Sequence, residues 1–376
     1  MKVRTSDIIG LVLLAGVATC RYWRPAADFY AERCYTPISA ALSGMASLVH
    51  FSLEEIVSGL FLLTFLVVLI RAIARKEGFF RWLLNTLRVV MWLVIWTDLA
   101  WGCNYFRTPL YERLEITPSH FEQTEFERFL SDYTRTLNES AGNVGSWEQS
   151  AVEQEIKDFY GGRAAECGYA PLRKWQHAKK PLLNPVYSAV TVLGWMGPFF
   201  CETQVNLDLP VLEYPSVLAH ETAHLAGVTG EGEANYWAYA FCRQSDDPSV
   251  RYSGCMELFP YVLANARALL TEEQYNAWLG SVSRRAKEDH NAIQDFWEGK
   301  RVGIIEKAQR FLMDLMLKSN GISEGAKDYS GVIGIIMTMD GYFGDSPAGP
   351  ALPSAPVSPS EPSEPSSTDN LPRMTA

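Results

Sequence analysis

The sequence has little positive charge, and it has no closely spaced cysteine pair. It has 33 Lys and Arg residues and 43 Asp and Glu residues, which gives a net charge of −10. A nucleic-acid-binding surface needs basic residues to neutralise phosphates, so we expect no nucleic-acid partner. None of the seven cysteines forms a C-x-x-C motif, which argues against a zinc ribbon or a thioredoxin-like site. A Cys242–Cys255 disulfide and free buried thiols remain alternatives.

Long apolar runs are rare in most of the chain, but three occur in its first hundred residues. They cover residues 8–20, 56–70 and 82–101, and the third contains Arg88 and Asp98. Each uncharged core is shorter than the roughly 20 residues that span a bilayer, so flanking residues must reach into the headgroup zone. Three such segments in series beside aromatic flanks predict three transmembrane helices rather than the buried helices of a soluble core.

The basic residues around these segments predict an orientation. Lys2 and Arg4 precede the first segment, and four basic residues lie between the second and the third: Arg71, Arg75, Lys76 and Arg81. The excess of Lys and Arg in cytoplasmic loops places the amino terminus and this loop inside the cell. Three crossings then place the rest of the chain outside the cytoplasm. A cleaved signal peptide is the alternative for the first segment, although the cleavage signature around Ala18 is poor.

We divide the chain into a membrane domain (1–105), an extracytoplasmic domain (106–342) and a Pro/Ser-rich tail (343–376). The tail has eight prolines between residues 347 and 372 and cannot bury enough apolar surface to fold. The expected fold class is α+β and mainly α, with transmembrane helices followed by a helical domain that contains a small β-sheet. Membrane lipid is therefore an expected partner.

Local patterns in the second domain predict its elements. Two segments rich in β-formers are expected to form a hairpin, with Gly194, Gly197 and Pro198 between them. These strands are residues 186–193 and 203–209. An extended substrate could pair with a sheet edge at the second strand. Helices are expected at residues 121–137, 214–226, 231–242, 257–270, 272–284, 302–318 and 326–339.

The segment LAHETAHLAG, residues 218–227, carries the strongest chemical signal. It contains H-E-x-x-H at His220, Glu221 and His224. Residues four apart share one face of a helix, so both imidazoles can bind one zinc ion, and Glu221 can act as a general base. The apolar residues around the motif make unpaired His and Glu side chains costly there. Gly227 follows where a left-handed helix cap is needed.

A catalytic zinc site usually has three protein ligands. Position 230 is glycine, which excludes the third histidine of the metzincin pattern. Glu233 is the preferred third ligand, because Ala234, Trp237 and Ala240 give it an apolar helix face that turns inward. Glu231 is the alternative. His290 or Tyr329 could donate a hydrogen bond to a tetrahedral intermediate.

Several segments together resemble the bacterial membrane proteins of the domain-of-unknown-function 3810 family. They are WGCNYFRTP (101–109), ETQVN (202–206), HETAH (220–224), EAN (233–235) and KSNGISEGAKDY (318–329). The resemblance covers nearly the whole chain up to about Tyr342. It implies transmembrane helices followed by a zincin-like domain, with His220, His224 and Glu233 as zinc ligands and Glu221 as the base.

These observations predict a zinc-dependent peptidase in a bacterial cytoplasmic membrane, a multi-pass protein with its catalytic domain outside the cytoplasm. The expected cofactor is Zn²⁺, and the expected substrates are peptides or proteins, including those of the cell envelope. A catalytically inactive zinc-binding sensor or scaffold is the main alternative, although a structural site does not need Glu221. A hydrolase of cell-wall peptide cross-links is a third hypothesis.

Overall fold

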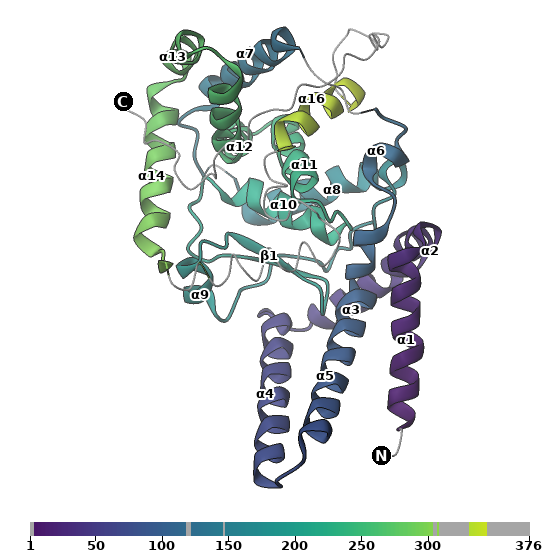
Figure 1. Ribbon diagram of the computed structural model, residues 1–376. Coiled ribbons are helices and arrows are strands. Elements are labelled where there is room, and N and C mark those ends of the chain that lie inside the picture. Colours follow the sequence, from purple (N-terminus) through teal and green to yellow (C-terminus); the bar gives the residue numbers. More distant parts are fainter. Residues whose placement is uncertain (1–3, 118–121, 146, 304–306, 308–330, 344–376) are drawn as a thin grey trace.

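The computed structural model describes residues 4–117, 122–145, 147–303, 307 and 331–343. The fold is mainly helical and contains one two-stranded antiparallel sheet, as predicted (Figure 1). Three apolar helices project from one end of a globular body made of the remaining elements. The domain boundaries at residues 105 and 342 stay predictions.

Three helices are long and apolar enough to cross a membrane. They are α1 (Thr5–Tyr22), α4 (Leu53–Ala74) and α5 (Phe79–Ala100). A helix of 22 residues, such as α4, is about 33 Å long, which matches the hydrocarbon core of a bilayer. The amino terminus and the α4–α5 turn lie at the same end, away from the globular body (Figure 1). Both basic regions are therefore on one side of these helices, and which side faces the cytoplasm stays a prediction.

Two charged residues within these helices pair with each other. Arg88 Nη2 of α5 lies 2.6 Å from Asp7 Oδ2 of α1, and Arg88 Nε donates to Asp7 Oδ1 over 2.8 Å. An ion pair of this kind allows two charges to lie within an apolar bundle, because each charge satisfies the other. The pair therefore ties α1 to α5.

A compact helical segment joins α1 to α4. It consists of α2 (Arg24–Phe29), the π-helical turn η1 (Tyr30–Tyr35) and α3 (Thr36–Ala46). The 3₁₀ turn η2 (Gly102–Phe106) follows α5 and packs against the same segment. Tyr30, Tyr35 and Trp101 are buried in a small apolar cluster between the apolar helices and the globular body. The sequence patterns did not predict this cluster.

The globular body is a helical core with α10 near its centre (Figure 1). Helix α12 packs against α7, α10 and α11, and its long apolar surface is buried among them. Trp237 and Phe259 are among the largest fully buried side chains. The helices are α6 (Leu110–Arg113), α7 (Gln123–Ser140), α8 (Gln149–Cys167), α9 (Asn184–Ala189), α10 (Tyr214–Leu225), α11 (Glu231–Gln244), α12 (Pro248–Leu269), α13 (Glu272–Ser281), α14 (Arg284–Lys300) and α16 (Val332–Phe343).

The hairpin differs from the prediction in its position. Strand β1 (Gly194–Gly197) pairs with β2 (Glu202–Val205) in antiparallel register, with Gly194 opposite Val205. The predicted strand at 203–209 overlaps β2, but the predicted strand at 186–193 is wrong. Helix α9 occupies the first half of that segment, because Pro185 suits the first turn of a helix. The glycines that were expected to separate the strands instead form the ends of β1.

The helix predictions succeed best around the H-E-x-x-H motif. Helices α10 and α11 begin at the predicted residues, whereas α12 begins nine residues before the predicted helix at 257–270. Helix α14 was not predicted. Most of the predicted helix at 302–318, the start of the one at 326–339 and nearly all of the tail lie outside the described residues. Cys242 and Cys255 are free buried thiols, so the alternative without a disulfide holds.

Candidate metal centre

Helix α10 is enclosed by the sheet on one side and by α11 and α12 on others. Pro215 lies in its first turn, where the missing N–H costs no helical hydrogen bond. Nearly every residue from Pro215 to Leu225 is buried, which explains the apolar residues on all sides of the motif. The helix ends at Leu225, and Gly227, two residues later, has a φ of +102°, the left-handed conformation that the sequence predicted there.

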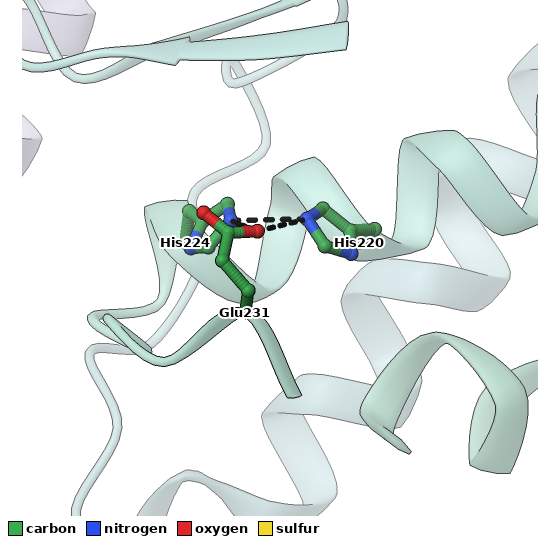
Figure 2. Close-up of side chains that lie close together, drawn as sticks. All are labelled: His220, His224 and Glu231. Atoms are coloured by element: carbon green, nitrogen blue, oxygen red, sulfur yellow. Dashed lines mark hydrogen bonds and ion pairs between the residues drawn. The ribbon is translucent and has the colours of Figure 1, made fainter. Parts of the chain in front are cut away.

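Three side chains converge on one point between α10 and the start of α11 (Figure 2). His220 Nε2 lies 3.1 Å from His224 Nε2 and 3.2 Å from Glu231 Oε2. His224 Nε2 lies 3.5 Å from the same carboxylate oxygen. Tetrahedral zinc with bonds of about 2.0–2.1 Å separates neighbouring ligand atoms by about 3.3–3.4 Å. The three donor atoms therefore have the spacing and the chemistry of a zinc site.

The third member of the group is Glu231, not the preferred Glu233. Glu233 Oε1 accepts a hydrogen bond from the hydroxyl of Tyr169, and it also lies 3.5 Å from Trp237 Nε1. Two residues along an α-helix correspond to a rotation of about 200°, so Glu231 and Glu233 face nearly opposite directions. The apolar neighbours of Glu233 do turn it inward, but toward Tyr169 instead of the imidazoles.

The second ring nitrogen of each imidazole, Nδ1, makes a hydrogen bond. His220 Nδ1 lies 2.7 Å from Asn235 Oδ1, and His224 Nδ1 lies 2.8 Å from the carbonyl oxygen of Val228. Both oxygens can only accept, so each Nδ1 carries the proton and donates it. When the ring is neutral, each Nε2 then carries the lone pair that a metal ion needs, as in metal-binding histidines. Asn235 had no assigned role in the sequence analysis, although it lies one helical turn after Glu231.

The charges within this group influence each other strongly. Burial would lower the pKa of His224, but the nearby Glu231 carboxylate outweighs that effect and raises it to about 9. Burial would raise the pKa of Glu231, but the two imidazoles outweigh it and hold that pKa well below its usual range. In the absence of a metal, the protein thus keeps a carboxylate and a proton at a point that a cation can occupy.

Segments next to the apolar helices hold the end of α10. Trp101 Nε1 donates to the carbonyl oxygen of His224 over 2.8 Å, and the Tyr35 hydroxyl donates to that of Leu225 over 2.7 Å. Carbonyl groups at a helix end have no partner within the helix, so these bonds satisfy groups that would otherwise be buried unpaired. The α1–α4 connection and Trp101, which links α5 to η2, therefore fix the position of the end of α10 that carries His224.

Glu221 lies beneath β1 rather than among the three donor groups. A Cβ atom on Gly194 would lie 2.6 Å from Glu221 Cγ, so only glycine lets the strand approach the carboxylate this closely. Burial raises the pKa of Glu221, and the backbone N–H of Met196 donates to its carboxylate. The general-base candidate is therefore adjacent to both the first histidine and the strand.

The free edge of the sheet belongs to β1. Lys179 pairs with Gln204 on the far side of β2, so β2 is an internal strand. Within the described residues, no segment pairs with the other edge of β1. In an antiparallel pair, the backbone groups of successive residues point alternately toward the partner strand and away from it. The N–H of Asn206 donates to the carbonyl of Leu193, so Leu193 points toward β2, whereas the backbone groups of Gly194 and Met196 point away from it. The free sheet edge with which a substrate could pair was expected at residues 203–209, but it belongs to β1.

A very small pocket of about 10 Å³ lies between α11 and α12, with room for about one water molecule. Its lining includes Asn235, Glu257 and Tyr261. The Tyr261 hydroxyl lies 3.5 Å from Asn235 Nδ2, and burial together with the Glu257 and Glu231 carboxylates raises its pKa. Tyr261 therefore stays a neutral phenol that can donate a proton in a hydrogen bond.

Of the two hydrogen-bond donors that the sequence suggested, only His290 lies within the described residues. His290 is buried on α14, where its ring stacks edge-on against Phe259 with 5.2 Å between centroids. Burial lowers the pKa of His290 to about 4, so it is neutral near pH 7. Tyr329 lies outside the described residues.

Comparison with known proteins gives a family but no activity. Searches of curated proteins and of solved structures returned no match. The chain matches the family described as "Protein of unknown function (DUF3810)" over residues 30–337, which include α4, α5, the sheet and all three members of the candidate metal group. The protein therefore belongs to the DUF3810 family.

Proposed function

We propose that this protein is a membrane-anchored, zinc-dependent peptidase. The observation that carries the proposal is the triangle of His220 Nε2, His224 Nε2 and Glu231 Oε2, with sides of 3.1–3.5 Å, next to the buried carboxylate of Glu221. Two histidines and one carboxylate are the ligand set of catalytic zinc sites that leave one position open. The orientation of the three apolar helices supports a location of this site outside the cytoplasm.

His220, His224 and Glu231 would hold the ion, and Asn235 and Val228 would keep the two rings in the required tautomer. A bound zinc ion supplies a Lewis acid that lowers the pKa of a coordinated water to about 7. Glu221 would accept a proton from the attacking water while the oxygen of that water bonds to the carbonyl carbon of the substrate. When the C–N bond breaks, Glu221 would return the proton to the leaving amine.

The remaining features of the site support an extended peptide as the substrate. The outward-facing N–H and C=O groups of Gly194 and Met196 can pair with a peptide backbone along β1. Such pairing would replace the present bond from Met196 N–H to Glu221 and free the carboxylate for proton transfer. The Tyr261 hydroxyl can donate to the developing oxyanion, a role that lowers the barrier of acyl transfer.

The proposal is tested on the purified full chain with a mixed peptide library, before and after treatment with a chelator. We expect hydrolysis that the chelator abolishes and added zinc restores. Glu221→Gln should retain zinc but lose at least about 100-fold in kcat, because it removes the general base. Zinc binding without hydrolysis by the unaltered chain would instead favour a sensor or scaffold, and absence of bound zinc would contradict the metal centre itself.

A further inference from the structure

A group of exposed apolar side chains surrounds the end of α4 that meets the globular body. We call Leu48, Phe51, Leu182, Leu183 and Val186 the apolar rim. Their exposed fractions are 83%, 38%, 53%, 55% and 49%, respectively. They come from the α3–α4 connection, from the segment before α9 and from α9 itself. Large apolar side chains that gather at one place on a surface usually mark an interaction site.

Hydrogen bonds fix the rim at the level where α4 begins. The N–H groups of Leu182 and Leu183 both donate to the carboxylate of Glu55, which lies in the first turn of α4. Phe51 pairs with Lys180 in an isolated bridge, and the N–H of Ser52 donates to the carbonyl of Lys180 over 3.2 Å. The two connecting segments are therefore bound to each other and to the first residues of the apolar helix.

The rim continues the exposed apolar surface of α4. Ile56 and Leu60, one and two turns into that helix, are also exposed. In a bilayer these side chains would contact lipid, and the adjacent rim would lie at the boundary between acyl chains and headgroups. Lys180 is exposed beside Phe51, at a level where a cationic side chain can contact lipid phosphates. In Figure 1, α9 lies on the side of the globular body that faces the apolar helices.

We infer that the apolar rim is a lipid-binding surface that inserts into the outer leaflet beside α4. Burial of its side chains in lipid removes apolar surface from water, which explains why Leu182, Leu183 and Val186 are exposed in the protein alone. The rim would also set the height of β1 above the bilayer. A Cβ on Gly197, at the end of β1, would lie 2.7 Å from Glu54 Cγ in the first turn of α4.

This inference uses the membrane placement of the proposed function but not its zinc chemistry. The test uses the full chain in lipid nanodiscs, with a fluorophore attached to a cysteine that replaces one exposed residue. Leu183→Cys and Val186→Cys report on the rim. Leu62→Cys, in the middle of α4, is the positive control, and Leu269→Cys, at the far end of α12, is the matched exposed control. The unaltered chain, labelled in parallel, measures the background from native thiols.

Replacement of ordinary lipids by brominated lipids should reduce the fluorescence of labels at positions 183, 186 and 62 but not at position 269. Quenching at position 62 without quenching at 183 and 186 would overturn the inference and leave the membrane placement intact. It would show that the rim does not contact lipid. Absence of quenching at position 62 would contradict the membrane placement, and the inference with it.

Discussion

Two faces of α11 each carry a glutamate, but the two glutamates have different partners. On one face, Glu231 and Asn235 lie one helical turn apart and meet the imidazoles of α10. On the other, Glu233 and Trp237 lie one turn apart and both contact the Tyr169 hydroxyl. The second face satisfies its polar groups within the protein. On the first face, the Glu231 carboxylate meets the Nε2 atoms of both imidazoles at one point, an arrangement that a cation stabilises.

This difference shows that helical phase, more than apolar surroundings, decides which carboxylate can bind a metal. Both glutamates lie in the first turn of the same helix, and both are enclosed by apolar neighbours. A rotation of about 200° separates them, and only Glu231 is directed toward the preceding helix. The following predictions test this contrast, from the largest expected effect to the smallest.

Glu231→Gln and Glu233→Gln form a matched pair that changes one oxygen to an amide on each face. We expect Glu231→Gln to weaken zinc binding by more than about 100-fold, because loss of a ligand should exceed the loss of its supporting partners. Glu233→Gln should bind zinc as the unaltered chain does. Competition with a chromophoric chelator measures both affinities. Equal weakening in the two variants would remove the distinction between the faces.

His290 provides a contrast from outside α11, since it is a buried imidazole without a carboxylate partner among the described residues. Burial lowers its pKa from 6.5 to about 4, so between these pH values the imidazole is protonated in the unfolded chain but neutral in the folded chain. Through this residue, the free energy of unfolding therefore falls by about 3 kcal/mol as the pH falls from 6.5 to 4.

His290→Gln should reduce this acid-dependent loss, which denaturant unfolding of the metal-free protein at pH 7 and pH 4.5 measures. The free energy of unfolding of the variant should then change less between the two pH values than that of the unaltered chain. An identical change in both proteins would show that His290 is protonated in the folded state.

Asn235→Ala tests the support of His220 without removing a ligand. The variant loses the acceptor for Nδ1–H, so the ring is free to turn and to change tautomer. We expect a 10- to 100-fold loss in zinc affinity, the usual effect of removing such a partner. Asn235→Asp keeps an acceptor and should restore most of the affinity. A full loss in Asn235→Asp as well would indicate a packing effect instead of a hydrogen bond.

Tyr169→Phe should have the smallest effect on the metal. It removes the hydroxyl that donates to Glu233 and accepts from Trp237 Nε1 over 2.6 Å. Two buried polar groups then lose a partner, and we expect the free energy of unfolding to fall by about 1–3 kcal/mol. Thermal unfolding measures this change, while zinc affinity should stay as in the unaltered chain. A parallel loss of zinc affinity would couple the two faces that the structure separates.

Much of the metal centre follows from sequence, because spacing within one helix is fixed by its geometry. Residues 220 and 224 lie on one face of any α-helix, and Gly227 follows the helix where a left-handed residue is needed. The third ligand depends on how the connection between α10 and α11 turns, and residue types alone do not determine that path. Glu231, at the helix start, was the alternative ligand.

The errors in the fold have similar physical causes. Residues 186–193 contain many β-formers, but Pro185 and the close approach of Gly194 to Glu221 place the helix and strand elsewhere. Helix α14 was missed because it is polar and buries mainly Ala286, His290 and Trp297. The apolar segments were found reliably, since helices of soluble proteins seldom contain apolar runs that are long enough to span a bilayer.

The central claim is that His220, His224 and Glu231 bind one zinc ion. Anomalous X-ray diffraction at the zinc edge, from crystals of the full chain grown with zinc, tests it directly. We predict one strong peak at about 2.0–2.2 Å from His220 Nε2, His224 Nε2 and a Glu231 carboxylate oxygen, with none beside Glu233. A crystal that contains zinc elsewhere but shows no peak between the two imidazoles would contradict the account.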